Sequence, residues 1–217
     1  MTAPRKTRSA RDSNIVFDRP HLVLVEGADD QAIISELITM EGLDDFQVHD
    51  MNGKDRWQYR IGLISKQPDF RNNVITLGLV RDADDRPDGA WDSCRFALKN
   101  AGLPVPTGPI VTASGHPVTA ILIIPSRNEH GAIEQLCLAS FDQTRLQCVN
   151  SYFDCLERAS SQATRSGKGL VQVYLGGLKN PPRDIPLAAA TGSLDLSHTV
   201  FDDVRQFLRN LAAPGVD

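Results

Sequence analysis

The chain has 217 residues, of which 41% are hydrophobic and 23% are charged, and its formal net charge is −4. These values predict a globular protein of one domain, with or without a helical appendage, and argue against a disordered chain. No hydrophobic run near the start is long enough for a secretory signal or a membrane span, so we expect a cytoplasmic protein without a membrane partner.

The first 19 residues are basic, whereas the rest of the chain is acidic. The charged residues of this segment are Arg5, Lys6, Arg8, Arg11 and Arg19 against Asp12 and Asp18. We expect a flexible tail over 1–19. It either stays solvated or acts as an arm that touches nucleic acid or another phosphate-rich partner.

Strand and helix patterns alternate over the next 80 or so residues. The predicted strands are 21–25, 46–51 and 74–81, the predicted helices are 29–40, 55–65 and 89–100, and a loop is expected over 68–73. This alternation predicts a parallel, doubly wound sheet.

The pattern changes after residue 104. Two apolar runs, 108–112 and 118–125, flank a Ser-Gly-His-Pro sequence that is typical of a turn, so a β-hairpin is expected. Helices are predicted from residue 131, over 144–163 and over 200–211, while 168–178 fits either a helix or a strand. The expected parts are therefore the tail (1–19), an α/β core (20–140) and a mainly helical extension packed on the core (141–217).

The four cysteines lack the Cys-x-x-Cys spacing of metal or redox sites, and they lie among apolar or helical neighbours. We expect reduced thiols in the core. The five histidines also lack metal-ligand spacing.

Two acidic clusters, 26–30 and 82–85, directly follow predicted strands. Open α/β sheets place their chemistry at the carboxyl ends of strands. Mg²⁺ prefers oxygen ligands and is usually held by one or two carboxylates together with water and substrate phosphate. If the strand continues, Asp82 and Asp84 point to the same face. The clusters therefore predict a cation site.

A purely structural interpretation of these carboxylates stays open. Glu26, Asp29 and Asp30 can cap a helix N-terminus, and 82–85 can form a polar turn. For Asp30 and Asp85 taken individually, this is the preferred interpretation.

The segments LVLVEGADD and LVRDADD, whose acidic residues Glu26 and Asp82 are 56 positions apart, resemble the Toprim domain over residues 20–135. This is the metal-binding α/β module of topoisomerases, primases and the OLD (overcoming lysogenization defect) nucleases. Small stand-alone Toprim proteins related to the OLD group are the most similar, because 131–134 resembles their downstream glycine and acidic position. The resemblance implies a Toprim-like, Rossmann-like, mostly parallel sheet flanked by helices, with a C-terminal helical extension.

The resemblance also implies metal ligands. Glu26 and Asp82 would be the principal ligands, with Glu26 also counted as catalytic. Asp84 and Glu134 would complete one or two metal positions, and Asp30 corresponds to a supporting acidic residue. The implied cofactor is Mg²⁺ or Mn²⁺.

A lysine would help to neutralise the transition-state phosphate. Lys168 is the candidate, with Lys179 in reserve. The alternative for Lys168 is a solvated position on a helix.

The function implied by the resemblance is a metal-dependent nuclease that hydrolyses phosphodiester bonds in nucleic acid, DNA in preference to RNA. The chain has no Gly-x-x-x-x-Gly-Lys-Ser/Thr loop. An ATPase would therefore be a separate subunit, as in antiphage defence or DNA-processing systems. The alternative is a non-catalytic Toprim-like regulatory subunit that binds a partner ATPase. Aspartate-based phosphoryl transfer fits the motifs less well, and the oligomeric state stays open.

Overall fold

The computed structural model describes residues 15–54, 57–159 and 165–214. Most of the predicted tail lies outside these ranges. Phe17, within the predicted tail, is fully buried, and its carbonyl accepts a hydrogen bond from Asn73 Nδ2 at 2.7 Å. The packed part of the fold therefore begins before residue 20.

A four-stranded parallel sheet lies at the centre of the described fold, in the order β2-β1-β3-β4. Its strands are β1 (His21–Val25), β2 (Phe46–Asp50), β3 (Thr76–Asp82) and β4 (Val118–Ile124). The register pairs Val23 with Val48 on one side and with Gly78 on the other. The predicted α/β class, with a parallel sheet, flanking helices and C-terminal helices, is confirmed.

Alternating side chains divide the core into two layers, because successive residues of a strand point to opposite faces. In β1, Leu22 and Leu24 belong to one cluster, and Val23 and Val25 belong to the other. Both faces are apolar and covered, as expected for a parallel sheet.

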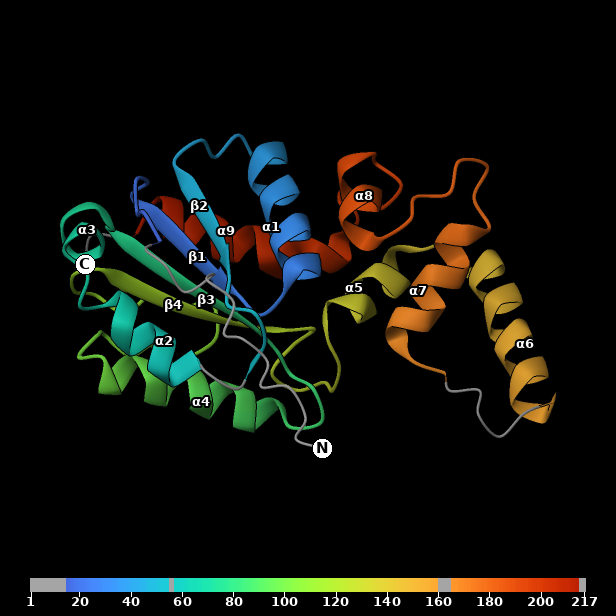
Figure 1. Ribbon diagram of the computed structural model, residues 1–217, viewed down its shortest axis with the longest axis horizontal. Coiled ribbons are helices and arrows are strands. Elements are labelled where there is room, and N and C mark those ends of the chain that lie inside the picture. Colours follow the sequence, from blue (N-terminus) through green and yellow to red (C-terminus); the bar gives the residue numbers. More distant parts are fainter. Residues whose placement is uncertain (1–14, 55–56, 160–164, 215–217) are drawn as a thin grey trace, which may run out of the picture.

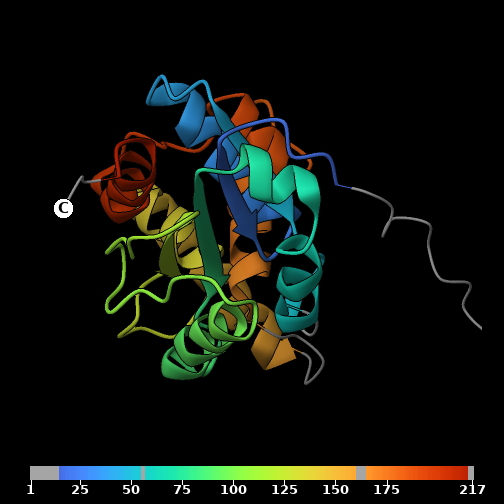
Figure 2. The same ribbon diagram turned by 90° about the vertical axis from the view of Figure 1, so that its left-hand side faces the viewer.

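Helices cover both faces of the sheet (Figure 1), and the view turned by 90° shows the strands between them (Figure 2). One face carries α2 (Trp57–Ile64), α3 (Pro68–Asn73) and α4 (Pro87–Asn100). The other carries α1 (Ala28–Met40), α8 (Ile185–Ala190), η3 (Thr199–Phe201) and α9 (Asp202–Ala212).

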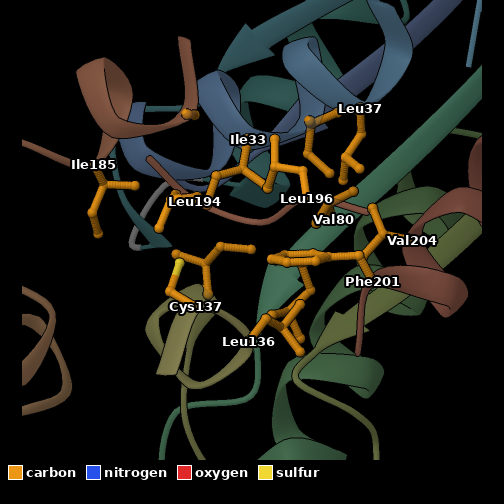
Figure 3. Packing of buried hydrophobic residues seen from close by; sticks show 14 of the residues in the cluster. Ile33, Leu37, Val80, Leu136, Cys137, Ile185, Leu194, Leu196, Phe201 and Val204 are labelled. Atoms are coloured by element: carbon orange, nitrogen blue, oxygen red, sulfur yellow. The ribbon is translucent and has the colours of Figure 1, made fainter. Parts of the chain in front are cut away.

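Three further helices, α5 (Ile133–Ser140), α6 (Gln143–Ala159) and α7 (Gly167–Gly176), lie beyond one end of the sheet (Figure 1). Their apolar contacts are continuous with the core under α1. Figure 3 shows side chains of α1, α5 and the C-terminal segments converging: Ile33, Leu37, Leu136, Cys137, Ile185, Leu194, Leu196, Phe201 and Val204.

The C-terminal helix α9 packs directly on β3 at Gly78. A Cβ atom built there would lie 2.6 Å from both Leu211 Cδ1 and Phe207 Cζ. The predicted apolar face of this helix is confirmed, because Val204, Phe207, Leu208 and Leu211 are at most 1% exposed.

Several predicted elements are wrong. Residues 68–73 form helix α3, which starts with Pro68 in its first turn and buries Phe70. The predicted hairpin is reduced to one antiparallel bridge between Ala113 and Thr119: 108–112 forms no strand, and β4 pairs in parallel with β3. Six of the seven residues in β4 are buried although β4 lies at the edge of the described sheet, because both faces of a parallel sheet are covered. The segment 168–178, which fitted either a helix or a strand, lies mostly in helix α7, which begins at Gly167.

All four cysteines are free. Cys94 and Cys137 are buried core thiols, as expected, whereas Cys148 and Cys155 are exposed on α6, which corrects the prediction for that pair. Within the described ranges, no helix combines the length and the apolar character needed to cross a bilayer.

Candidate functional site

The two acidic segments meet where β1 and β3 end, in a pocket of about 400 Å³ that we call the acidic pocket. Its charged lining residues are Glu26, Asp29, Asp30, Asp50, Asp82, Glu134 and Lys168. Five of the six predicted site residues are among them, and Asp84 is the exception. Parallel strands bring the first two segments together, and helices α5 and α7 add Glu134 and Lys168.

Helix α5 is anchored to the end of β3. The Ile133 amide donates to Asp82 Oδ1 at 3.2 Å, which places the first turn of α5, and with it Glu134, beside this carboxylate. Just before the helix, Gly131 (φ +126°) exchanges two backbone hydrogen bonds with Asp84, at 2.7 and 2.9 Å. Glycine suits this left-handed conformation.

The Asp30 side chain caps helix α1 and also lines the acidic pocket. Its Oδ2 accepts the Gly27 amide at 2.9 Å, so the capping interpretation is confirmed for this oxygen. Its Oδ1 is buried and has no hydrogen-bond partner among the residues that the structure describes. Burial raises the pKa of Asp30 to about 7, and the charges of Glu26 and Glu134 add to this.

Asp82 lies among carboxylates in the same pocket. Burial is the main cause that raises the pKa of Asp82 to about 9, followed by repulsion from Asp30, Glu26 and Glu134. Such a carboxyl holds its proton unless positive charge compensates it.

Glu26 forms an ion pair with Arg81. Arg81 Nε lies 3.2 Å from Glu26 Oε2, and the two side chains are 9% and 15% exposed. Arg81 Nη1 also donates to Ser93 Oγ at 2.9 Å, and its guanidinium lies 5.5 Å from the centre of the Trp57 ring. Burial raises the pKa of Glu26 despite the neighbouring arginine.

Asp84 leaves the strand direction. β3 ends at Asp82, and Asp84 has a left-handed backbone (φ +49°). Its Oδ2 lies 2.6 Å from Lys54 Nζ, and it lines a neighbouring pocket. The condition under which Asp82 and Asp84 would point to the same face is therefore not met, because the chain turns after Asp82.

Lys168 reaches the acidic pocket from a segment 139 residues away from its partner. Its Nζ lies 2.7 Å from Asp29 Oδ2, and this hydrogen bond is the main cause that raises the pKa of Lys168. The Ser166 side chain caps the helix by accepting the Gly169 amide at 3.0 Å. The reserve candidate Lys179 is not among the lining residues.

Two lining residues, Asp50 and Asn52, were not predicted from the sequence. Asp50 ends β2, next to β1 in the sheet. Glu26 and Asp82 were identified because they follow predicted strands. The same argument, applied to the end of the predicted strand 46–51, could have identified Asp50.

The donor set of the acidic pocket fits a hard divalent cation. No group of three or more His, Cys, Asp or Glu side chains in the described part of the chain is placed to hold a metal ion by itself. Mg²⁺ does not require such a group, since it commonly uses one or two carboxylates and completes its shell with water and phosphate. A bound cation would give Asp30 Oδ1 a partner and would offset the repulsion that raises the pKa of Asp82.

A family model with the description "Protein of unknown function (DUF3226)" matches residues 20–213. No curated protein sequence matches the chain. Among solved structures, the C-terminal region of the OLD protein of Xanthomonas campestris pv. campestris is similar, with a TM-score of 0.48 and 11% sequence identity over 90% of this chain and 95% of that chain.

Proposed function

The chain belongs to the DUF3226 family, and we propose that it is a Mg²⁺- or Mn²⁺-dependent nuclease of the OLD-like Toprim type. The substrate is nucleic acid, with DNA preferred to RNA, and the reaction is phosphodiester hydrolysis. The observation that carries the proposal is the convergence of Glu26, Asp30, Asp82, Glu134 and Lys168 on one pocket from four separate segments.

The residues have distinct roles in this proposal. Asp82 and Glu26 would hold the cation, with Asp30 and Glu134 adding negative charge to the same pocket. When bound, a divalent cation polarises a phosphoryl oxygen and lowers the pKa of a coordinated water. Arg81 keeps Glu26 in place through the 3.2 Å ion pair.

Lys168 supplies the positive charge at the edge of the pocket. Its side chain is 57% exposed and its ammonium group is bound to Asp29, so a substrate phosphate can compete for the ammonium group from solvent. In that position it balances the charge that develops on the phosphate during hydrolysis.

A second candidate function is the non-catalytic subunit that binds a separate ATPase. It is favoured by the ion pairs that occupy Glu26, Asp29 and Asp84, and by the absence of a ready three-carboxylate set among the described residues. The two candidates differ in whether the purified chain cleaves nucleic acid.

The direct test is cleavage of supercoiled plasmid, single-stranded DNA and RNA by the purified chain in Mg²⁺ and in Mn²⁺. We expect cleavage by the wild type and a loss of at least about 100-fold in Asp82→Asn, with Asp92→Asn as the control. Asp92 is exposed on α4 and does not line the acidic pocket. No cleavage by the wild type, in a protein that co-purifies with an ATPase, would support the second candidate instead.

A further inference from the structure

A second pocket, of about 430 Å³, adjoins the acidic pocket, and we call it the basic pocket. Its polar lining residues are Lys54, Arg81, Arg86, Ser93, Asp84 and Asp85. Three cationic side chains thus line this pocket together with two carboxylates, whereas carboxylates outnumber cations in the acidic pocket.

Two of the three cations of the basic pocket, Lys54 and Arg86, are accessible to a ligand. Arg81 is bound to Glu26 through Nε, to Ser93 through Nη1 and to the Cys94 side chain, so it contributes positive charge to the pocket. Arg86 is exposed, and its guanidinium forms no ion pair or hydrogen bond within the described ranges. Lys54 is bound to Asp84 at 2.6 Å, but its side chain is 51% exposed.

Helix α4 adds backbone donors to the same place. Arg86 is its N-cap residue and provides no side-chain cap, and Pro87 stands in the first turn. Gly89, also in the first turn, lines the pocket. The positive end of a 14-residue helix favours an anion, and through Gly89 its first turn lines the same pocket as the three cationic side chains, although that turn also carries Asp88.

The two pockets are adjacent. The Glu26–Arg81 ion pair joins them, since Glu26 lines the acidic pocket and Arg81 lines the basic pocket. The chain also passes directly from one to the other between Gly53 and Lys54, and again between Asp82 and Ala83. A nucleic-acid strand that enters one pocket is therefore beside the other.

We propose that the basic pocket binds a backbone phosphate that flanks the phosphate held at the acidic pocket. This inference rests on the proposed nuclease function. Arg86, with its unengaged planar guanidinium, is the principal phosphate ligand, and Lys54, the charge of Arg81 and the N-terminus of α4 complete the site.

The test is binding of fluorescently labelled 12-nucleotide single-stranded DNA and RNA, followed by anisotropy over a range of salt concentrations in Ca²⁺, with gel electrophoresis to show that the probe stays intact. Arg86→Gln is compared with Arg95→Gln, which removes an exposed arginine of the same helix outside the pocket. We expect Arg86→Gln to weaken binding about tenfold, as for one charge-assisted hydrogen bond. The salt dependence of log K should also decrease by about 0.7, the value for one single-strand phosphate contact.

The outcomes separate this inference from the nuclease proposal. Equal binding by the wild type and Arg86→Gln, or an equal loss in Arg95→Gln, would overturn the phosphate site even if the wild type cleaves nucleic acid. A selective loss in Arg86→Gln supports the site even if cleavage is absent, which would count against the nuclease alone. Inorganic phosphate is added as a competitor: displacement of the probe from the wild type but not from Arg86→Gln supports the phosphate site, and equal displacement from both proteins would overturn it.

Discussion

At the scale of single residues, Asp82 links the acidic pocket to stability. Its pKa of about 9 in the folded chain lies above the ordinary value of 3.8, so the folded state binds its proton more tightly than the unfolded state. This contribution to stability is fully present at low pH and is lost as pH rises from about 3.8 to about 9. Asp30, with its pKa raised to about 7, acts in the same direction.

We therefore predict that Asp82→Asn is more stable than the wild type at pH 8.5 in EDTA, because the amide carries no charge in the pocket. Thermal unfolding between pH 5 and pH 9 measures this, and the gap between the two proteins should close toward pH 5. Asp92→Asn should follow the wild type throughout. A variant less stable than the wild type at pH 8.5 would contradict the assigned electrostatics.

Arg81 is predicted to hold Glu26 in position. Replacing it by Met leaves a buried carboxylate without its ion pair, so Arg81→Met should reduce the free energy of unfolding by about 3 kcal/mol in urea titration. Adding Glu26→Gln to this variant should restore part of the loss, because the unpaired charge is gone. Equal losses in the single and double variants would show that the ion pair is not the cause.

Some residues of the site were predictable from the sequence, and others were not. Glu26 and Asp82 were predictable because the strand-end rule depends only on the apolar run before them. The position of Asp84 was not, because a single left-handed residue redirects its side chain to Lys54. Lys168 was identified through a resemblance, and its contact with Asp29 depends on packing across 139 residues.

At the scale of elements, Gly78 determines how closely α9 approaches the sheet. A methyl group there would meet Phe207 and Leu211 at 2.6 Å, so Gly78→Ala should destabilise the fold by about 1–3 kcal/mol through overpacking. Gly62→Ala in α2 is the matched control, since its added Cβ meets nothing within 4 Å and the change should be neutral or stabilising. Urea unfolding of both variants checks this, and equal effects would contradict the close packing.

The elements with strong local patterns were predicted correctly, and those decided by tertiary packing were not. The strand His21–Val25 was predicted at its observed bounds, because turn residues on both sides of a short apolar run mark where the strand begins and ends. The run 118–125 was assigned to a hairpin from its neighbouring turn residues. Its parallel pairing with β3 depends on a partner about 40 residues away, which local turn signals do not reveal.

At the scale of the whole molecule, the C-terminal segment is part of the fold that forms the site. Helix α9 covers β3 and β4, and α7 brings Lys168 to the acidic pocket. The apolar side chains buried by this segment include Phe201, Val204, Phe207, Leu208 and Leu211. At about 1.5–3 kcal/mol each, their burial is worth on the order of 10 kcal/mol, comparable with the total stability of a typical domain.

We accordingly predict that a chain ending at residue 140 does not fold, although it contains every strand of the described sheet. Circular dichroism and urea titration of the truncated protein test this. A cooperative unfolding transition in that protein would show that the α/β core is independent of the C-terminal helices.

The central claim is that the acidic pocket binds a divalent cation through Asp82 and Glu26. The most direct test is isothermal titration calorimetry with Mn²⁺ and Mg²⁺ on the wild type, Asp82→Asn and Asp92→Asn at pH 7.5. We predict binding by the wild type and by Asp92→Asn, and a loss of at least about tenfold in affinity in Asp82→Asn. Absence of binding by the wild type, or equal binding by all three proteins, would contradict it.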